Sequence, residues 1–223
     1  MIEACKKAAA EKAATLVEDG MIVGLGTGST AAYFIEALAK RHKSGLKIQT
    51  VASSSTSLRL AQQGGLPLID LNSLKSIDLY VDGADEIDPS KQMIKGAGGA
   101  LLREKILAHM SSEMTVIVDE TKLVQALGTR PLPVEIIPFG LHATLHHLHQ
   151  LGYRGQIRKG PDGQPWMTEN SNYIFDVKIS PPCRIKDDHD RICSIPGVIE
   201  TGFFQNQAGR VIIGFKDGSV VVQ

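Results

Sequence analysis

Short apolar runs alternate with amphipathic stretches over the first 120 residues of the chain. The apolar runs have the length of buried strands, at 21–25, 47–52, 77–83 and 113–120. Helical patterns lie around them, at 3–19, 30–42, from after residue 57 to Gly64-Gly65, and at 100–110. Gly20 stands where a C-terminal glycine cap would end the first helix. This alternation predicts an α/β fold, a Rossmann-like parallel sheet with helices on both faces.

The pattern changes near Thr129, where a proline-rich segment begins. Strand-like runs dominate afterwards, among them the alternating segment 173–179, with one clear helix at 141–152. The last segment predicts a hairpin across Lys216-Asp217-Gly218, because Asp-Gly favours tight hairpin turns. We therefore expect a smaller α+β domain with an antiparallel sheet. The expected domains are 1–129 with 203–223, and 130–202.

Composition narrows the class of protein. The 223 residues are 43% hydrophobic, and 24 Lys and Arg balance 24 Asp and Glu, so a packed core is expected. A net charge of zero argues against nucleic-acid and membrane-surface partners. The cysteines are few and widely spaced, which indicates free thiols in a reducing cytoplasm, at Cys5, Cys183 and Cys193. The chain shows no signal peptide and no apolar run of about 18 residues, so we expect a cytoplasmic protein without a membrane partner.

The segment GLGTGST at 24–30 places a glycine turn between a strand and a helix, an arrangement that binds anions at the helix N-terminus. The dinucleotide fingerprint is excluded because Ser29 takes the place of its third glycine, and no lysine completes a Walker A loop. The hydroxyls of Thr27, Ser29 and Thr30 suit a single phosphate. A nucleotide site and a purely structural turn remain alternatives.

A second hydroxyl-rich turn, SSSTS at 53–57, follows the next predicted strand. The carboxyl ends of parallel strands share one edge of a sheet, so both turns can face one crevice. Ordinary capping of the following helix by serine or threonine explains the same residues equally well.

The acidic loop DGADEID at 82–88 follows a buried strand. Asp82 and Asp85 are separated only by Gly83 and Ala84, so both carboxylates are expected at the same strand end. Paired carboxylates there suit hydroxyl binding and proton handling. A solvated acidic loop is one alternative, and a divalent metal site is another, using Asp82, Asp85, Glu86 and Asp88.

Lys95 and Glu104 flank the start of the next helix. Lys95 opens the turn KGAGG, where a buried lysine can stabilise an oxyanion, although a surface lysine fits as well. The helical neighbours of Glu104 three and four positions away are all apolar, which predicts that Glu104 is buried. Because burial raises the pKa of a carboxyl group, such a residue suits a general base. A glutamate reaching water from the edge of the apolar face is the alternative.

Four histidines on the predicted helix at 141–152 imitate a metal cluster, at positions His142, His146, His147 and His149. That helix contains no cysteine or carboxylate to complete a site. We expect these side chains to face solvent and no metal to bind there.

Taken together, these segments resemble the type A ribose-5-phosphate isomerase family, nearly from end to end. The matching blocks occur in the family's order: VGLGTGSTA, ASSSTS, DLYVDGADEID, KGAGGALLREKI, VDETKLV, LPVEIIPF, NYIFDV and IPGVIETGFF. The resemblance implies an aldose–ketose isomerase that interconverts D-ribose 5-phosphate and D-ribulose 5-phosphate through an enediolate, in the non-oxidative pentose phosphate pathway. It implies no cofactor, no metal, and a homo-oligomer, dimer or tetramer.

The resemblance also implies roles for individual residues. Glu104 matches the catalytic base, and Lys95 matches the residue that stabilises the enediolate oxygen. Asp82 and Asp85 match the pair that binds the sugar hydroxyls and moves their protons. The substrate- and phosphate-binding positions are Thr27, Gly28, Ser29, Thr30, Asp82, Gly83, Ala84, Asp85, Lys95, Gly96, Ala97, Gly98 and Lys122, with Lys6 as a further cation.

Ala97 departs from the family pattern, which has four glycines after the lysine. If the position needs positive φ, alanine costs on the order of 1 kcal/mol.

Proteins of other classes share parts of this pattern. A non-catalytic sugar-phosphate sensor would use the same phosphate loop, but it would need an attached DNA-binding motif and has no use for Glu104, Asp82 and Lys95 together. An aminosugar-phosphate deaminase or a CoA-transferase-like enzyme on a related fold is a further alternative.

Overall fold

The computed structural model describes residues 1–179 and 184–223, so Cys183 lies outside the described residues. The chain forms two compact units. Unit 1 comprises Met1–Ala84, Arg103–Leu123 and Asn206–Gln223, and unit 2 comprises Asp85–Leu102 and Val124–Gln205. The domains expected from the sequence differ from these units, because they assign residues 85–102 to the first domain and place the boundary between residues 129 and 130. The expected domain division stays a prediction.

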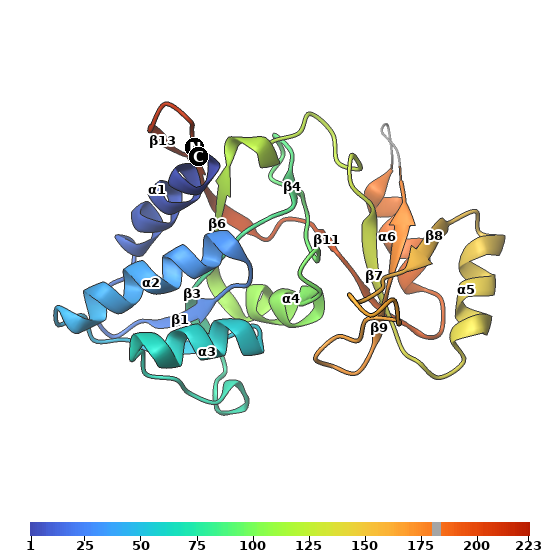
Figure 1. Cartoon of the computed structure of the whole chain (residues 1–223), viewed down its shortest axis with the longest axis horizontal. Coiled ribbons are helices and arrows are strands. Elements are labelled where there is room, and N and C mark those ends of the chain that lie inside the picture. Colours follow the sequence, from blue (N-terminus) through green and yellow to red (C-terminus); the bar gives the residue numbers. More distant parts are fainter. Residues whose placement is uncertain (180–183) are drawn as a thin grey trace. The chain divides into compact units, whose positions relative to one another are not determined.

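Unit 1 is built on a six-stranded sheet, which Figure 1 shows edge-on among its helices. Its order is β13-β12-β6-β3-β1-β2, with parallel pairing throughout except between β12 and β13. The strands are β1 (Ile22–Leu25), β2 (Gln49–Ala52), β3 (Ile77–Asp82), β6 (Ser111–Asp119), β12 (Ala208–Gly214) and β13 (Val220–Val222). The four strands predicted in the first 120 residues and the C-terminal hairpin are confirmed.

Three helices lie side by side on one face of this sheet: α1 (Ile2–Ala14), α2 (Ser29–Lys43) and α3 (Ser55–Gly64). Their apolar side chains form one core with Leu79 and Val81 of β3. Successive strand residues point to opposite faces, so Tyr80 points away from this core. The charge of Glu104, which belongs to α4 (Leu101–Met110), contributes to raising the pKa of Tyr80. Short 3₁₀ helices complete the unit, η1 (Leu71–Ser73) and η2 (Glu120–Lys122).

The first helix ends at Ala14, so the prediction that it continues to Gly20 is wrong. The Thr15 hydroxyl donates to the carbonyl three residues earlier, and the next two amides also bond three residues back, which tightens the chain. Val17 is thereby buried in the core. The Arg41 guanidinium donates to the carbonyls of Ala14 and Val17, satisfying groups that a helix end leaves open.

Unit 2 is a smaller α+β unit with two antiparallel sheets. One has the order β10-β7-β9-β8, and the other has the order β11-β5-β4. Its strands are β4 (Glu86–Ile87), β5 (Met93–Ile94), β7 (Leu132–Ile136), β8 (Arg154–Ile157), β9 (Tyr173–Lys178), β10 (Val198–Thr201) and β11 (Phe203–Phe204). The helices α5 (Leu141–Gln150) and α6 (Ile185–Cys193) share a core with β7 and β9. The predicted fold class is confirmed.

No helix within 1–179 and 184–223 combines the length and the apolar composition needed to cross a membrane.

Candidate active site

Most of the predicted site residues of unit 1 lie at one edge of its sheet. Thr27 follows β1, Ser53 follows β2, and Asp82 ends β3, while Lys122 lies in η2 directly after β6. These strands are parallel, so their carboxyl ends meet at the same edge, where open α/β sheets bind ligands.

The two hydroxyl-rich turns contact each other at this edge. The Thr27 hydroxyl lies 2.8 Å from Ser53 Oγ and donates to Ser54 Oγ at 2.9 Å. Ser54 also caps α3, since its Oγ accepts a hydrogen bond from the amide of Ser57 at 3.1 Å. In turn, the Ser57 hydroxyl oxygen accepts a hydrogen bond from the Ser54 amide. The capping explanation is therefore confirmed, and the two turns contact each other, while a shared crevice for a ligand stays a prediction.

The helix that follows the first turn begins with a glycine and without a side-chain cap. Gly28, at φ 106°, precedes the first residue of α2. Its carbonyl accepts a hydrogen bond from the amide of Ala32. The amides between them, at residues 29–31, lie in the first turn, where a helix offers N–H groups to an anion. Lys6 of α1 extends to this place, and its Nζ donates to Ser29 Oγ at 3.1 Å.

Asp82 is fully buried and held by several donors. Its Oδ1 accepts from the amides of Thr27 at 3.0 Å and Gly83 at 2.7 Å, and its Oδ2 accepts from the Tyr80 hydroxyl at 2.5 Å. Burial raises the pKa of Tyr80, and the Asp82 charge raises it further, so the phenol stays protonated and donates. A Cβ on Gly26 would lie 2.1 Å from Asp82 Oδ1, so only glycine fits there.

Glu104 is buried, with 4% of its surface exposed, as its apolar neighbours on the helix predict. Leu101 and Leu107 on the same face are buried as well, whereas Ile106 faces outward. The charge of Glu104 contributes to raising the pKa of Tyr80. A side chain reaching water at the edge of the apolar face is excluded.

In unit 2, the turn at 95–99 holds Lys95 in a buried position. The Lys95 amide donates to the Gly202 carbonyl at 2.8 Å, and its Nζ lies 5.6 Å from the centre of the Phe204 ring. With 3% exposure, the surface-lysine alternative is excluded. Asp85 holds the next part of the turn, because its Oδ2 accepts from the Ala97 amide at 2.8 Å.

Ala97 fits this turn without strain. The positive φ angles belong to Gly96 (109°) and Gly99 (75°), and Ala97 is not among the residues with positive φ. The substitution therefore avoids the cost that a left-handed position would impose.

Arg158 is a residue of this region that the sequence did not reveal. Its guanidinium donates to the carbonyls of Gly96 at 2.8 Å and Ala97 at 3.1 Å. It also forms a two-pronged ion pair with Asp176, at 3.0 and 2.6 Å. A pocket of about 260 Å³ opens beside it, lined by Asp85, Ile94, Ala97, Arg130, Pro131, Pro133, Arg158 and Asp176.

Replacing Arg158 with lysine should loosen the turn at 95–99 because an ammonium group cannot replace the planar, two-pronged guanidinium. We expect the variant to stay folded and its kcat for the isomerisation that the sequence predicts to fall by about tenfold or more. A displacement of active-site groups by about 1 Å can lower the rate by up to 10²-fold. Steady-state kinetics with circular dichroism test this. Arg154→Lys is the matched control, because that side chain bonds only the His149 carbonyl among the described interactions. Equal kinetics in both variants would show that Arg158 does not position the turn.

The rest of the acidic loop is tied into unit 2. Glu86 is buried and accepts from the Gly128 amide at 2.8 Å and from the Thr129 hydroxyl. Asp88 accepts from the Gln92 amide at 2.9 Å. Within the described residues, one group of side chains has the spacing of metal ligands, namely His189, Cys193 and Glu200. Neither Glu86 nor Asp88 belongs to it.

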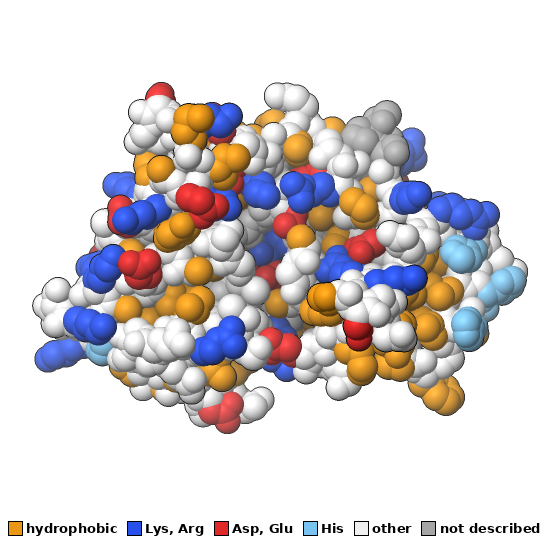
Figure 2. All heavy atoms as spheres, viewed as in Figure 1, with side chains coloured by type: hydrophobic (Ala, Val, Ile, Leu, Met, Phe, Trp, Pro, Cys, Tyr) orange, Lys and Arg blue, Asp and Glu red, His pale blue; other side chains and the backbone are white. Residues whose placement is uncertain are grey.

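The four histidines of α5 face solvent as expected. Figure 2 shows histidine side chains gathered on the surface of the molecule.

The fold and these residues define a mixed α/β protein with two hydroxyl-rich turns at the carboxyl edge of a parallel sheet. The model of the family "Ribose 5-phosphate isomerase A (phosphoriboisomerase A)" matches residues 49–218. The chain belongs to this family.

Relatives and solved structures support the assignment over the whole chain. The ribose-5-phosphate isomerase A of Protochlamydia amoebophila is 53% identical over 96% of this chain and 92% of its own length. That of Bacillus mycoides is 47% identical over 96% of both. A solved D-ribose-5-phosphate isomerase in complex with phospho-erythronic acid is 39% identical, with a TM-score of 0.95 over 100% of this chain and 99% of that one. The Plasmodium falciparum ribose 5-phosphate isomerase is 37% identical with a TM-score of 0.95, covering 100% and 98%.

Proposed function

We propose that this chain interconverts D-ribose 5-phosphate and D-ribulose 5-phosphate. The observation that carries the proposal is family membership along nearly the whole chain, with relatives of that name at up to 53% identity. The buried glutamate and the buried lysine supply the two kinds of group that an aldose–ketose isomerisation needs. The reaction moves a proton between adjacent carbons, and this proposal requires neither cofactor nor metal.

Glu104 is the proposed base. Its carboxylate would take the proton from C2 of the open-chain aldose and return it to C1, so that an enediolate forms and then collapses to the ketose. A positioned general base contributes typically 10²–10⁴-fold to such a step. The burial of Glu104 supports this role, because water competes little for a carboxylate that is 4% exposed.

Lys95 would stabilise the negative oxygen of the enediolate. A donor placed at a developing charge in a site with little water is worth about 10²–10³-fold in rate. The Lys95 ammonium suits this role because its side chain is buried and its backbone is held by Gly202. Asp82 and Asp85 would bind the sugar hydroxyls and move their protons while the ring opens.

The phosphate of the substrate is assigned to the start of α2. Residues 27–30 would supply amides and hydroxyls, and Lys6 and Lys122 would supply positive charge. The hydrogen bond from Lys6 Nζ to Ser29 Oγ supports the assignment of Lys6 to the phosphate. The position of Lys122 directly after β6 supports the assignment of Lys122. The backbone at Gly83, Ala84, Gly96, Ala97 and Gly98 would pass close to the sugar.

A direct assay tests this function. The purified chain is mixed with D-ribose 5-phosphate, and ketose formation is followed by absorbance. We expect ketose to appear without any added cofactor. Tight binding of ribose 5-phosphate without ketose formation would favour the sensor alternative, while ammonia release from an aminosugar phosphate would favour the deaminase.

The proposal includes a place for the enzyme in the cell. We infer a role in the non-oxidative pentose phosphate pathway and a cytoplasmic location, which the few and widely spaced cysteines of the sequence support. A homodimer or homotetramer stays a prediction, which sedimentation of the purified chain can test.

A further inference from the structure

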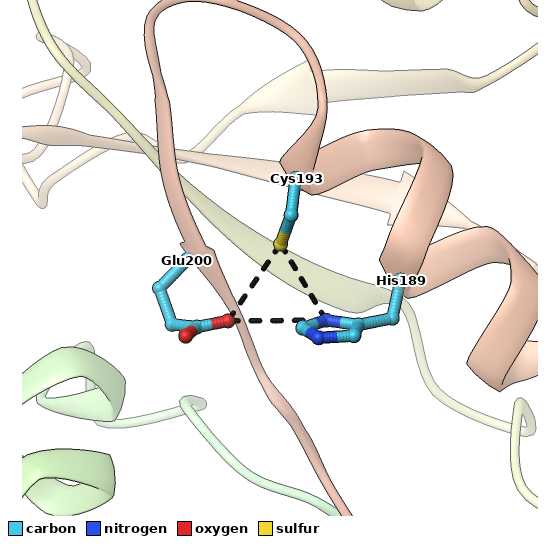
Figure 3. A group of neighbouring side chains, drawn as sticks. All are labelled: His189, Cys193 and Glu200. Atoms are coloured by element: carbon cyan, nitrogen blue, oxygen red, sulfur yellow. Dashed lines mark hydrogen bonds and ion pairs between the residues drawn. The ribbon is translucent and has the colours of Figure 1, made fainter.

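Three side chains of unit 2 converge on one point, as Figure 3 shows. His189 and Cys193 are one turn apart on α6, so both lie on the same face of the helix, and Glu200 comes from β10. Cys193 Sγ is 3.5 Å from His189 Nδ1 and 3.8 Å from Glu200 Oε1, and the nitrogen and that oxygen are 3.8 Å apart. A thiol, an imidazole and a carboxylate thus form a nearly equilateral triangle.

The arrangement differs from that of a nucleophile with its base. In a catalytic triad, the nucleophile contacts one imidazole nitrogen and the carboxylate contacts the other. Here the thiol and the carboxylate both approach the same nitrogen, His189 Nδ1. Donor atoms that converge in this way are suited to a common ligand.

The dimensions of the triangle suit a zinc ion. Zinc binds cysteine sulfur at about 2.3 Å and nitrogen or oxygen at about 2.0–2.2 Å, in tetrahedral geometry. Two ligand atoms of one tetrahedral zinc are therefore about 3.4–3.6 Å apart. The observed separations of 3.5, 3.8 and 3.8 Å need only a few tenths of an ångström of contraction. A sulfur and an imidazole in one ligand set favour zinc over magnesium or calcium.

We propose that His189, Cys193 and Glu200 form a Zn²⁺ site. On binding, the Cys193 thiol loses its proton to solvent and the sulfur–zinc bond forms, with no change of oxidation state. The thiolate and the Glu200 carboxylate then balance the charge of the ion. His189 and Glu200 are 25% and 21% exposed, so a hydrated ion can reach the site, and water takes the fourth position.

Neighbouring groups already orient two of the ligands. The Thr201 amide donates to Glu200 Oε1 at 2.7 Å, and the Thr201 hydroxyl lies 2.8 Å from His189 Nδ1. The same hydroxyl oxygen accepts from the Phe203 amide at 3.2 Å, so its proton is available to point at the nitrogen. This hydrogen bond leaves the lone pair of Nδ1 without a proton of its own, as metal binding requires. Zinc would replace the Thr201 proton at Nδ1, and the hydroxyl would turn to the bound water.

The ion would connect α6 to β10. The chain continues from β10 to Gly202, whose carbonyl accepts from the Lys95 amide at 2.8 Å. Zinc would therefore act as a brace on the backbone that carries Lys95. This inference does not rest on the proposed isomerase function, because metal binding can be measured without substrate.

Cobalt titration tests the site directly. Co²⁺ replaces Zn²⁺ and gives a thiolate charge-transfer band in the near ultraviolet, together with the visible bands of tetrahedral cobalt. We expect both with one equivalent of Co²⁺ per chain, and their loss when Zn²⁺ is added. Cys193→Ser should abolish the charge-transfer band, and His189→Asn and Glu200→Gln should weaken binding by about tenfold or more.

The matched controls are Cys5→Ser, a cysteine of unit 1, and His146→Asn, a histidine of α5. Both should keep the full spectrum. Zn²⁺ should also raise the melting temperature of the wild-type chain but not of Cys193→Ser, with circular dichroism confirming that each variant folds without metal. A missing charge-transfer band in the wild type, or an unchanged band in Cys193→Ser, would overturn the proposal. Ketose formation assayed in the presence of a chelator reports on the isomerase function separately.

Discussion

Glu104→Gln is expected to bind ribose 5-phosphate with nearly the wild-type affinity and to lose about 10²–10⁴-fold in kcat. The amide has the same shape as the carboxylate, so packing of α4 is preserved, but it cannot accept the C2 proton. Steady-state kinetics give the loss of kcat, and calorimetric titration with the substrate gives the affinity. A second readout is exchange of the C2 hydrogen with deuterated water, which should disappear together with turnover.

Two controls separate a chemical role of Glu104 from a structural one. Glu36→Gln changes an exposed carboxylate on α2 that pairs with Lys40, and it should leave kcat unchanged. Glu104→Asp keeps a carboxylate but withdraws it by one methylene, so it should retain more activity than the glutamine variant. If Glu104→Gln keeps near-normal kcat, the base is another residue.

Strands β1, β3 and β6 of unit 1 could be predicted because each contains a continuous apolar run that is buried on both faces. The chain from Ile77 to Asp82, for example, is buried at all positions except Asp78. Their parallel order then places the residues after each strand at one edge, so Thr27, Ser53 and Asp82 could be grouped before any contact was known.

The missed elements of unit 2 lack such a signal. Helix α6 buries only Ile185 and Ile192 and is otherwise charged or polar, so it has no apolar stripe to detect. Strand β7 contains Pro133, which normally argues against a central strand. The structure accommodates it because β10 pairs only with residues 134–136, so the proline lies just beyond the end of that pairing. Strands of two residues, such as β4 and β5, are too short for any periodicity.

The sequence indicated which polar residues lie at the strand ends but not which residues hold them in place. Arg158 bonds the carbonyls of Gly96 and Ala97 from about 60 positions away in the chain, and no local pattern encodes such a contact. The spacing of His189 and Cys193 was visible, but their convergence with Glu200 depends on how β10 packs against α6. Long-range tertiary contacts therefore carry the information that periodicity lacks.

Lys95→Met is expected to reduce kcat by about 10²–10³-fold with little change in the affinity for ribose 5-phosphate. Methionine fills the same buried space beside Phe204 without a charge, so the enediolate oxygen loses its donor while the ground state keeps its phosphate contacts. Phospho-erythronic acid, the ligand of a solved relative, carries a carboxylate that imitates the charge of an enediolate. If Lys95 has the proposed role, binding of this acid to the variant should weaken far more than binding of the substrate. Parallel calorimetric titrations with the two ligands measure this difference.

The exposed Lys178 of β9 provides the control, since Lys178→Met removes a charge from the same unit without touching the turn at 95–99. The double variant Lys95→Met with Glu104→Gln gives a sharper test. If both groups act on one enediolate, removing the second should cost much less than removing it alone, because without a base no enediolate forms to be stabilised. Losses that multiply fully, or equal weakening of both ligands in Lys95→Met, would assign Lys95 to ground-state binding instead.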